Sequence, residues 1–188
     1  MKGREIIIGV TGGIACYKSA ALVSQLVQAG AGVSVVMTRA ARRFVGRATF
    51  EALSGRAVHR RLFDEAGHPL GPHITLAERA ELLCIAPATA NFMAKAATGL
   101  ADDLLSTLYL AFDGLVIMAP AMNCQMWAKS CVERNVDQLR ADGVHIIDPE
   151  EGWLSCRQQG VGRMASPETI RAVIERLLAE RTARASAP

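Results

Sequence analysis

Apolar residues along this chain gather in short runs that turn-forming residues separate. Five runs predict buried strands, at residues 4–10, 33–38, 82–86, 115–119 and 144–148. Most of them are apolar at consecutive positions rather than at alternate ones. That pattern is typical of parallel strands covered on both faces. The chain is therefore predicted to contain a parallel sheet buried between two layers.

Helical segments alternate with these strands. They are predicted at residues 14–28, 40–45, 49–53, 74–80, within 87–99, and at 102–111, 125–140 and 166–181. Ser166-Pro167 gives the last helix an N-cap and a proline at its first position, and Asp102 or Asp103 caps the helix that ends at Ala111. Gly and Pro predict a loop over 54–72, around a short strand near Val58, and a Gly-rich loop over 149–163.

This alternation predicts an α/β fold, a doubly wound parallel sheet in a three-layer sandwich. The 188 residues suit a single domain, which we place at residues 1–182. The remaining residues, 183–188, are expected to form a disordered tail.

Charge and cysteine usage exclude several classes of protein. A net charge of +3, from 21 basic and 18 acidic residues, is too weak and too dispersed to indicate nucleic-acid binding. No apolar stretch is long enough to predict a membrane span. Five cysteines without a CxxC pair indicate a reducing cytoplasm and no zinc or other metal site. The basic residues Arg39, Arg42, Arg43 and Arg47 predict a solvated helix face, with contact to an anionic ligand as the alternative.

The loop Gly9-Val-Thr-Gly-Gly-Ile14 joins the first strand to the first helix. Its glycines leave backbone amides unobstructed at a helix N-terminus, which predicts an anion site, and Thr11 adds a hydroxyl donor. The spacing matches neither GxGxxG nor GxxxxGK[ST], so a mononucleotide phosphate, as in FMN, is the natural ligand. The alternative is a plain Gly-rich turn used for packing.

The segment Ala119-Pro-Ala-Met-Asn123 follows the strand at 115–119. In open α/β sheets, ligands bind just beyond the carboxyl ends of such strands. Asn123 offers both a donor and an acceptor, which suits recognition of a carboxylate or an amide. Alternatively, Asn123 only caps the helix that follows.

Four segments, taken in order, resemble one family. They are Thr11-Gly-Gly-Ile-Ala15; His73-Ile-Thr-Leu with Ala86-Pro-Ala-Thr-Ala-Asn91; Pro120-Ala-Met-Asn123 with Met126-Trp127; and Ser155-Cys156 with Gly160-Val-Gly-Arg-Met164. In this spacing they resemble the flavin-containing cysteine decarboxylases, over roughly residues 6–178. Within that family, the likeness is greatest to the members that decarboxylate 4′-phosphopantothenoylcysteine in coenzyme A biosynthesis.

The resemblance implies a flavodoxin-like subunit that binds FMN between neighbouring subunits of a homotrimer, or of a dodecamer built from trimers. The implied FMN contacts are Gly12, Gly13, Ile14, Thr38, Thr89, Ala90, Asn91 and Ala121. The implied catalytic residues are His73, Asn123 and Cys156, and the implied substrate contacts are Asn123, Met126, Arg163 and Met164.

These residues suit the chemistry. A cysteine carboxylate loses CO2 readily only after the thiol carbon has been oxidised to a thioaldehyde, which provides an electron sink, and flavin accepts that hydride. The enethiolate that remains takes the hydride back together with a proton, for which Cys156 is the candidate donor. Asn123 is predicted to hold the substrate carboxylate, and His73 to relay a proton or orient the substrate.

One position departs from the family. Arg157 follows Cys156 where relatives usually have glycine, so a positive φ at this residue would strain the turn. The alternative is that the charge of Arg157 tunes the thiol. Two alternatives stay open: an oxidative decarboxylase of a peptide's C-terminal cysteine, whose members typically have PASN, and a non-catalytic regulatory flavoprotein. The sequence ends just after the last predicted helix, so we expect no synthetase domain within it.

Overall fold

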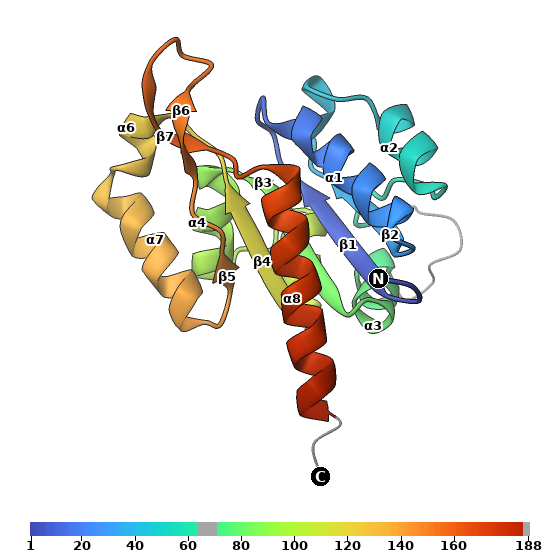
Figure 1. The fold of residues 1–188 in the computed structure, drawn as a ribbon. Helices are drawn as coiled ribbons and strands as arrows, with labels where there is room; N and C mark the ends of the chain where they lie inside the picture. Colours follow the sequence, from blue (N-terminus) through green and yellow to red (C-terminus); the bar gives the residue numbers. More distant parts are fainter. Residues whose placement is uncertain (64–70, 186–188) are drawn as a thin grey trace.

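A five-stranded parallel sheet forms the centre of the computed structural model, which describes residues 1–63 and 71–185 (Figure 1). The strands are β1 (Glu5–Val10), β2 (Gly32–Met37), β3 (Leu82–Ala88), β4 (Leu115–Pro120) and β5 (His145–Ile146). Their spatial order is β2-β1-β3-β4-β5. The order reverses between β1 and β3, which creates a switch point where open α/β sheets bind ligands.

Helices cover both faces of the sheet, as predicted. One face carries α1 (Cys16–Gln28), α2 (Arg47–Ser54) and α8 (Pro167–Ala185), and the other carries α3 (Pro72–Arg79), α4 (Ala90–Thr98), α5 (Leu104–Ala111) and α7 (Ser130–Ala141). Consecutive residues of β1 enter opposite cores: Ile6 and Ile8 pack with Leu22 of α1, whereas Ile7 packs with Leu105 of α5. The continuous apolar pattern of the strands follows from this burial on both faces.

Several predicted elements differ from the structure. The predicted helix 40–45 is only a 3₁₀ turn, η1 (Ala41–Arg43), and the strand predicted near Val58 is a single bridge between Val36 and His59. The last helix continues to Ala185, and residues 186–188 of the predicted tail lie outside the described residues. The loop predicted over 54–72 includes residues 64–70, which also lie outside them.

The predicted helix 125–140 is interrupted. It consists of α6 (Cys124–Trp127) and α7, and the extended backbone of Lys129 separates them. Neither glycine nor proline marks this break, so the sequence pattern carries no signal for it. Among the described residues, no helix has both the length and the apolar character that crossing a membrane requires.

The Gly-rich segment 149–163, predicted to be a loop, is an antiparallel hairpin of β6 (Glu150–Trp153) and β7 (Gln159–Arg163). Most of its residues are polar or glycine and are exposed or only partly buried, so the apolar pattern of a strand is absent. The hairpin stands over the carboxyl ends of the sheet strands (Figure 1).

Backbone contacts dock this hairpin onto the segment that follows β4. The Met122 amide donates to the Gly162 carbonyl at 3.0 Å. A Cβ at Gly162 would lie 2.2 Å from the Met122 carbonyl oxygen, so only glycine allows the two backbones to approach this closely.

The tip of the hairpin contains Arg157 with a φ of 63°. It is the one residue other than glycine with a positive φ in the described part of the chain. Two hydrogen bonds close the turn, from the Arg157 amide to the Leu154 carbonyl at 2.9 Å and from the Leu154 amide to the Gln158 carbonyl at 2.8 Å. The strain expected at this departure from the family is therefore present.

We expect Arg157→Gly to stabilise the protein. The left-handed conformation costs a residue with a Cβ about 1–2 kcal/mol, which glycine does not incur. Glycine also raises the conformational entropy of the unfolded chain, and this offsets part of the stabilisation. The expected net increase in the free energy of unfolding is about 0.5–1 kcal/mol. Urea unfolding followed by tryptophan fluorescence measures it, because Trp153 lies in the hairpin.

The matched control is Gln158→Gly, next to Arg157 but with a negative φ, which should lower stability by a similar amount. Equal destabilisation by the two substitutions would show that the turn at Arg157 carries no strain.

Candidate active site

A cavity of about 730 Å³ lies beyond the carboxyl ends of β1, β3 and β4. Its walls come from the loops after these strands and after β2, the starts of α1 and α4, and the β6–β7 hairpin. The lining includes most residues predicted from the sequence: Gly12, Gly13, Ile14, Thr38, Thr89, Ala90, Asn91, Ala121, Asn123, Met126, Cys156, Arg163 and Met164. The structure thus brings together residues that are up to 152 positions apart in the chain (Gly12 to Met164).

The loop between β1 and α1 is held tightly against its neighbours. A Cβ at Gly12 would lie 2.3 Å from the Cβ of Ala40, whereas Gly13 has more space around it. The Thr11 hydroxyl donates to the Pro87 carbonyl at 2.6 Å and accepts from the Thr89 amide at 3.0 Å. Thr11 was expected to donate to an anion, but its proton is used to join this loop to the loop after β3.

The loop after β3 leads directly into α4. Thr89 is the N-cap of that helix, and its hydroxyl accepts from the Phe92 amide at 3.4 Å. Ala90 and Asn91, in the first turn of α4, line the cavity. The cavity is therefore bordered by the N-terminal ends of two helices, α1 and α4, where backbone amides favour anions and hydrogen-bond acceptors.

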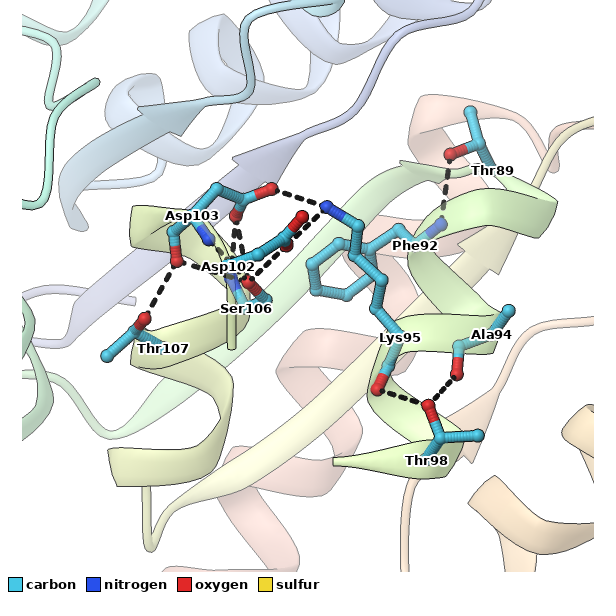
Figure 2. A network of polar contacts seen from close by, with 9 residues as sticks. All are labelled: Thr89, Phe92, Ala94, Lys95, Thr98, Asp102, Asp103, Ser106 and Thr107. Atoms are coloured by element: carbon cyan, nitrogen blue, oxygen red, sulfur yellow. Dashed lines mark hydrogen bonds and ion pairs between the residues drawn. The ribbon is translucent and has the colours of Figure 1, made fainter. Parts of the chain in front are cut away.

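An ionic network anchors the wall formed by α4 (Figure 2). Lys95 binds Asp102 at 2.5 Å and Asp103 at 3.0 Å, and Asp103 forms a capping box with Ser106 at the start of α5. Burial acts to lower the pKa of Lys95, but its hydrogen bonds to the two carboxylates outweigh this effect and raise it. This network confirms the predicted cap at Asp103 and fixes α4 against α5.

Asn123 connects two parts of the site. Its Oδ1 accepts from the Gln125 amide at 2.7 Å and so caps α6, while its Nδ2 donates to Cys156 Sγ at 3.1 Å. The interpretation of Asn123 as a helix cap is confirmed, and the structure also places its side chain against Cys156. The cap fixes the orientation of the amide, so that its NH2 group points to the tip of the hairpin.

His73 does not line the cavity of its own chain. It lies in the first turn of α3, and its Nδ1 is buried without a hydrogen-bond partner among the described residues. A single chain therefore brings Asn123 and Cys156 together but leaves His73 elsewhere.

The other cysteines differ from Cys156 in their surroundings. Complete burial raises the pKa of Cys84 to about 12, and burial also raises the pKa of Cys16. Both are packing residues of the core. Cys124 is partly buried, Cys131 is exposed on α7, and Cys156 is the cysteine that lines the cavity.

Sequence reasoning missed several lining residues: Tyr17, Lys18, Lys95, Asp103, Trp153 and Ser155. Helical spacing held the signal for two of them, since Lys18 lies four residues after Ile14, and Lys95 four residues after Asn91. Arg39 reaches the cavity, whereas Arg42, Arg43 and Arg47 are exposed. The basic stretch is thus mostly a solvated face with one residue at the site.

Comparison with known proteins gives a consistent result. Residues 1–179 match the model of the Flavoprotein family. The coenzyme A biosynthesis bifunctional protein CoaBC of Bacillus subtilis is 46% identical over 182 residues, which cover 97% of this chain and 45% of that protein. The CoaBC protein of Haemophilus influenzae is 43% identical over 170 residues, which cover 90% of this chain and 42% of that protein. The chain thus spans less than half the length of these curated relatives.

Solved structures agree with these relatives. A PPC decarboxylase mutant complexed with pantothenoylaminoethenethiol has a TM-score of 0.83 at 29% identity, over 96% of this chain and 100% of that one. The FMN-dependent cysteine decarboxylase SpaF has a TM-score of 0.76 at 36% identity, over 85% of this chain and 90% of that one. These likenesses confirm the predicted flavodoxin-like fold and the predicted resemblance, and the chain belongs to the Flavoprotein family.

Proposed function

We propose that this chain is an FMN-dependent carboxy-lyase that converts 4′-phosphopantothenoylcysteine to 4′-phosphopantetheine in coenzyme A biosynthesis. The observation that carries the proposal is the contact between Asn123 and Cys156, in a cavity whose wall includes the Gly-rich loop between β1 and α1. The names of the CoaBC relatives and of the PPC decarboxylase structure support the substrate. The five free cysteines suit the reducing cytoplasm in which such an enzyme would act.

The residues at the cavity fit FMN. The amides of Gly12, Gly13 and Ile14 at the start of α1 suit the phosphate, and the close packing of Gly12 on Ala40 holds that loop in place. Thr38, the loop residues 89–91 and Ala121 would hold the rest of the cofactor. A volume of about 730 Å³ is within the range of cofactor sites. When bound, FMN supplies a reversible acceptor for the hydride of the substrate's thiol carbon.

Asn123 binds the substrate carboxylate beside the flavin. Its Nδ2 donates to Cys156 Sγ in the structure, and the same N–H group is oriented to donate to a carboxylate in its place. A neutral amide binds the carboxylate without the strong stabilisation that a cation would give. The carboxylate is then positioned but still able to leave as CO2.

Cys156 is the proton donor to the enethiolate. Its sulfur accepts the bond from Asn123, so the S–H proton remains available for transfer. The proton goes to the carbon that CO2 has left, and the hydride removed at the start returns to the thiol carbon. The overall reaction exchanges CO2 for a proton and needs no external oxidant.

We expect Cys156→Ser to stop the reaction after CO2 loss, because a hydroxyl is a much weaker acid than a thiol. Mass spectrometry of the product should show the unsaturated enethiol in place of 4′-phosphopantetheine. The control is Cys131→Ser, an exposed position on α7, which should give the saturated product at the normal rate. Full conversion to the saturated thiol by Cys156→Ser would remove Cys156 from the mechanism.

One alternative has support from a specific observation. The SpaF structure, at 36% identity, is named only as an FMN-dependent cysteine decarboxylase, which leaves a peptide substrate with an enethiol product open. Met122, where the peptide-acting relatives typically have serine, and Cys156 in the cavity favour the pantothenoyl substrate. An enethiol as the final product of the unaltered protein would favour the alternative.

We propose further that the active form is a homotrimer, or a dodecamer of trimers, in which His73 of one copy reaches the cavity of another. Two observations support this: His73 is absent from the cavity of its own chain, and Ile14, Tyr17 and Trp153 at the cavity are 59%, 62% and 67% exposed. Large apolar and aromatic side chains that are this exposed around a site are typical of a protein–protein interface, here with a second copy of the chain.

A mixing experiment tests this arrangement. His73→Gln and Cys156→Ser are each expected to lose decarboxylation to the saturated product. Reassembly of a 1:1 mixture should restore about a quarter of the activity, because that fraction of intersubunit sites receives an intact His73 and an intact Cys156 from different copies. No recovery in the reassembled mixture would contradict a shared site, provided that a mixture of tagged wild-type chains exchanges subunits.

A further inference from the structure

Two cationic side chains of the cavity, Lys18 and Arg163, have no part in the chemical steps proposed so far, although the family resemblance implies a substrate contact for Arg163. Lys18 comes from α1 and Arg163 from β7, so the two lie where the base of the hairpin meets that helix. Lys18 Nζ donates to the Met164 carbonyl at 2.5 Å, which places the ammonium group beside the residue that follows Arg163. The cavity wall thus carries a pair of neighbouring cations.

The surroundings of Lys18 disfavour its positive charge. Burial and the charge of Arg163 lower the pKa of Lys18. Lys18 also lies at the third position of α1, where the helix dipole disfavours a cation, and the first turn contains no acidic residue. A protonated amine kept in such surroundings gains most when an anion binds beside it.

Nearby carboxylates are already engaged. Glu150 and Glu168 are the acidic groups that act to raise the pKa of Lys18. Glu150 accepts from the Ser166 amide at 3.0 Å and pairs with Arg163 at 3.7 Å, while Glu168 accepts from Gln25 at 2.6 Å. By contrast, Lys95, another cation of this cavity, is held by two carboxylates at 3.0 Å or less.

Both cations keep donors for a ligand. An ammonium has three N–H groups, and the Met164 carbonyl takes one of those of Lys18. Arg163 has five N–H groups, a long ion pair with Glu150 as its one ion pair within residues 1–63 and 71–185, and a side chain that is 46% exposed. Together they match the several oxygens and the double negative charge of a phosphate monoester.

The length of the hairpin fits the proposed substrate. Strand β7 rises about 3.3 Å per residue, so its four steps from Gln159 to Arg163 cover at most about 13 Å along the strand. In 4′-phosphopantothenoylcysteine, about thirteen bonds separate the thiol sulfur from the phosphorus, an extended span of about 16 Å. With the thiol end beside Cys156, the phosphate end reaches the base of the hairpin.

We propose that Lys18 and Arg163 form a phosphate-monoester subsite that takes the 4′-phosphate of the substrate at the end of the cavity away from Cys156. This inference rests on the proposed function, because it assigns the far end of the same substrate. It gives the enzyme a means to prefer the phosphorylated substrate over pantothenoylcysteine.

The test compares two substrates in flavin-loaded protein. For each variant, the ratio of kcat/KM for 4′-phosphopantothenoylcysteine to that for pantothenoylcysteine is measured. Lys18→Met should lower this ratio about tenfold or more, because it removes a charge-assisted hydrogen bond to the phosphate. Lys18→Arg, which keeps the charge, should retain most of the preference. Lys129→Met removes an exposed lysine outside the cavity and should leave the ratio unchanged.

An unchanged ratio in Lys18→Met would overturn the subsite. If kcat/KM falls equally on both substrates, Lys18 is a structural tie to Met164, and if neither value falls, Lys18 has no part in substrate recognition. A rise in the dissociation constant of FMN, measured by flavin fluorescence and accompanied by an unchanged ratio, would assign the cation to the phosphate of FMN.

A binding measurement separates this inference from the proposed function. Calorimetric titration of the flavin-loaded protein with 4′-phosphopantetheine and with pantetheine needs no turnover. If the unaltered protein turns over neither substrate, the proposed function fails. Tighter binding of the phosphorylated compound that is lost in Lys18→Met would still support the subsite, and equal binding of the two compounds would contradict it.

Discussion

The close approach of two backbones at Gly162 is the contact on which the candidate site depends. The Gly162 carbonyl accepts from the Met122 amide, and a side chain at this position would collide with the Met122 carbonyl. This contact holds the hairpin over the end of β4, and the N-cap of α6 then turns the amide of Asn123 toward Cys156. Two segments more than thirty residues apart become one site because a glycine allows them to touch.

The sheet was predictable because its signal is local. Strands buried on both faces, such as β1 with Ile6, Ile7 and Ile8, are apolar at consecutive positions. A capping residue such as Asp103 marks where a helix begins, in this case α5. The hairpin was predicted as a loop because its strands contact backbone on one side and are exposed to solvent on the other. Its sequence, which includes Gly152 and Gly160, therefore lacks the apolar alternation of a half-buried strand. The break at Lys129 lacks any breaker residue and depends on tertiary packing.

Site residues that belong to a motif of the resembled family were predicted from the sequence. Site residues that only lie at a suitable spacing from such a motif were not. Gly12, Asn123 and Cys156 belong to recognisable segments and meet in the cavity as expected. Lys18 and Lys95 lie one helical turn beyond such segments, in positions that spacing alone could have indicated. The separation of His73 from the cavity depends on how helix α3 packs, which no short motif encodes.

The effect of Gly162→Ala on turnover tests the central claim most directly, namely that docking of the hairpin assembles the catalytic site. The account predicts that this variant still binds FMN, because the Gly-rich loop and the start of α4 are unchanged, but loses decarboxylation of 4′-phosphopantothenoylcysteine. Gly46→Ala is the control, because a Cβ there meets nothing within 4 Å and its φ is −71°. Normal turnover by Gly162→Ala, with the same flavin content as the control, would contradict the account.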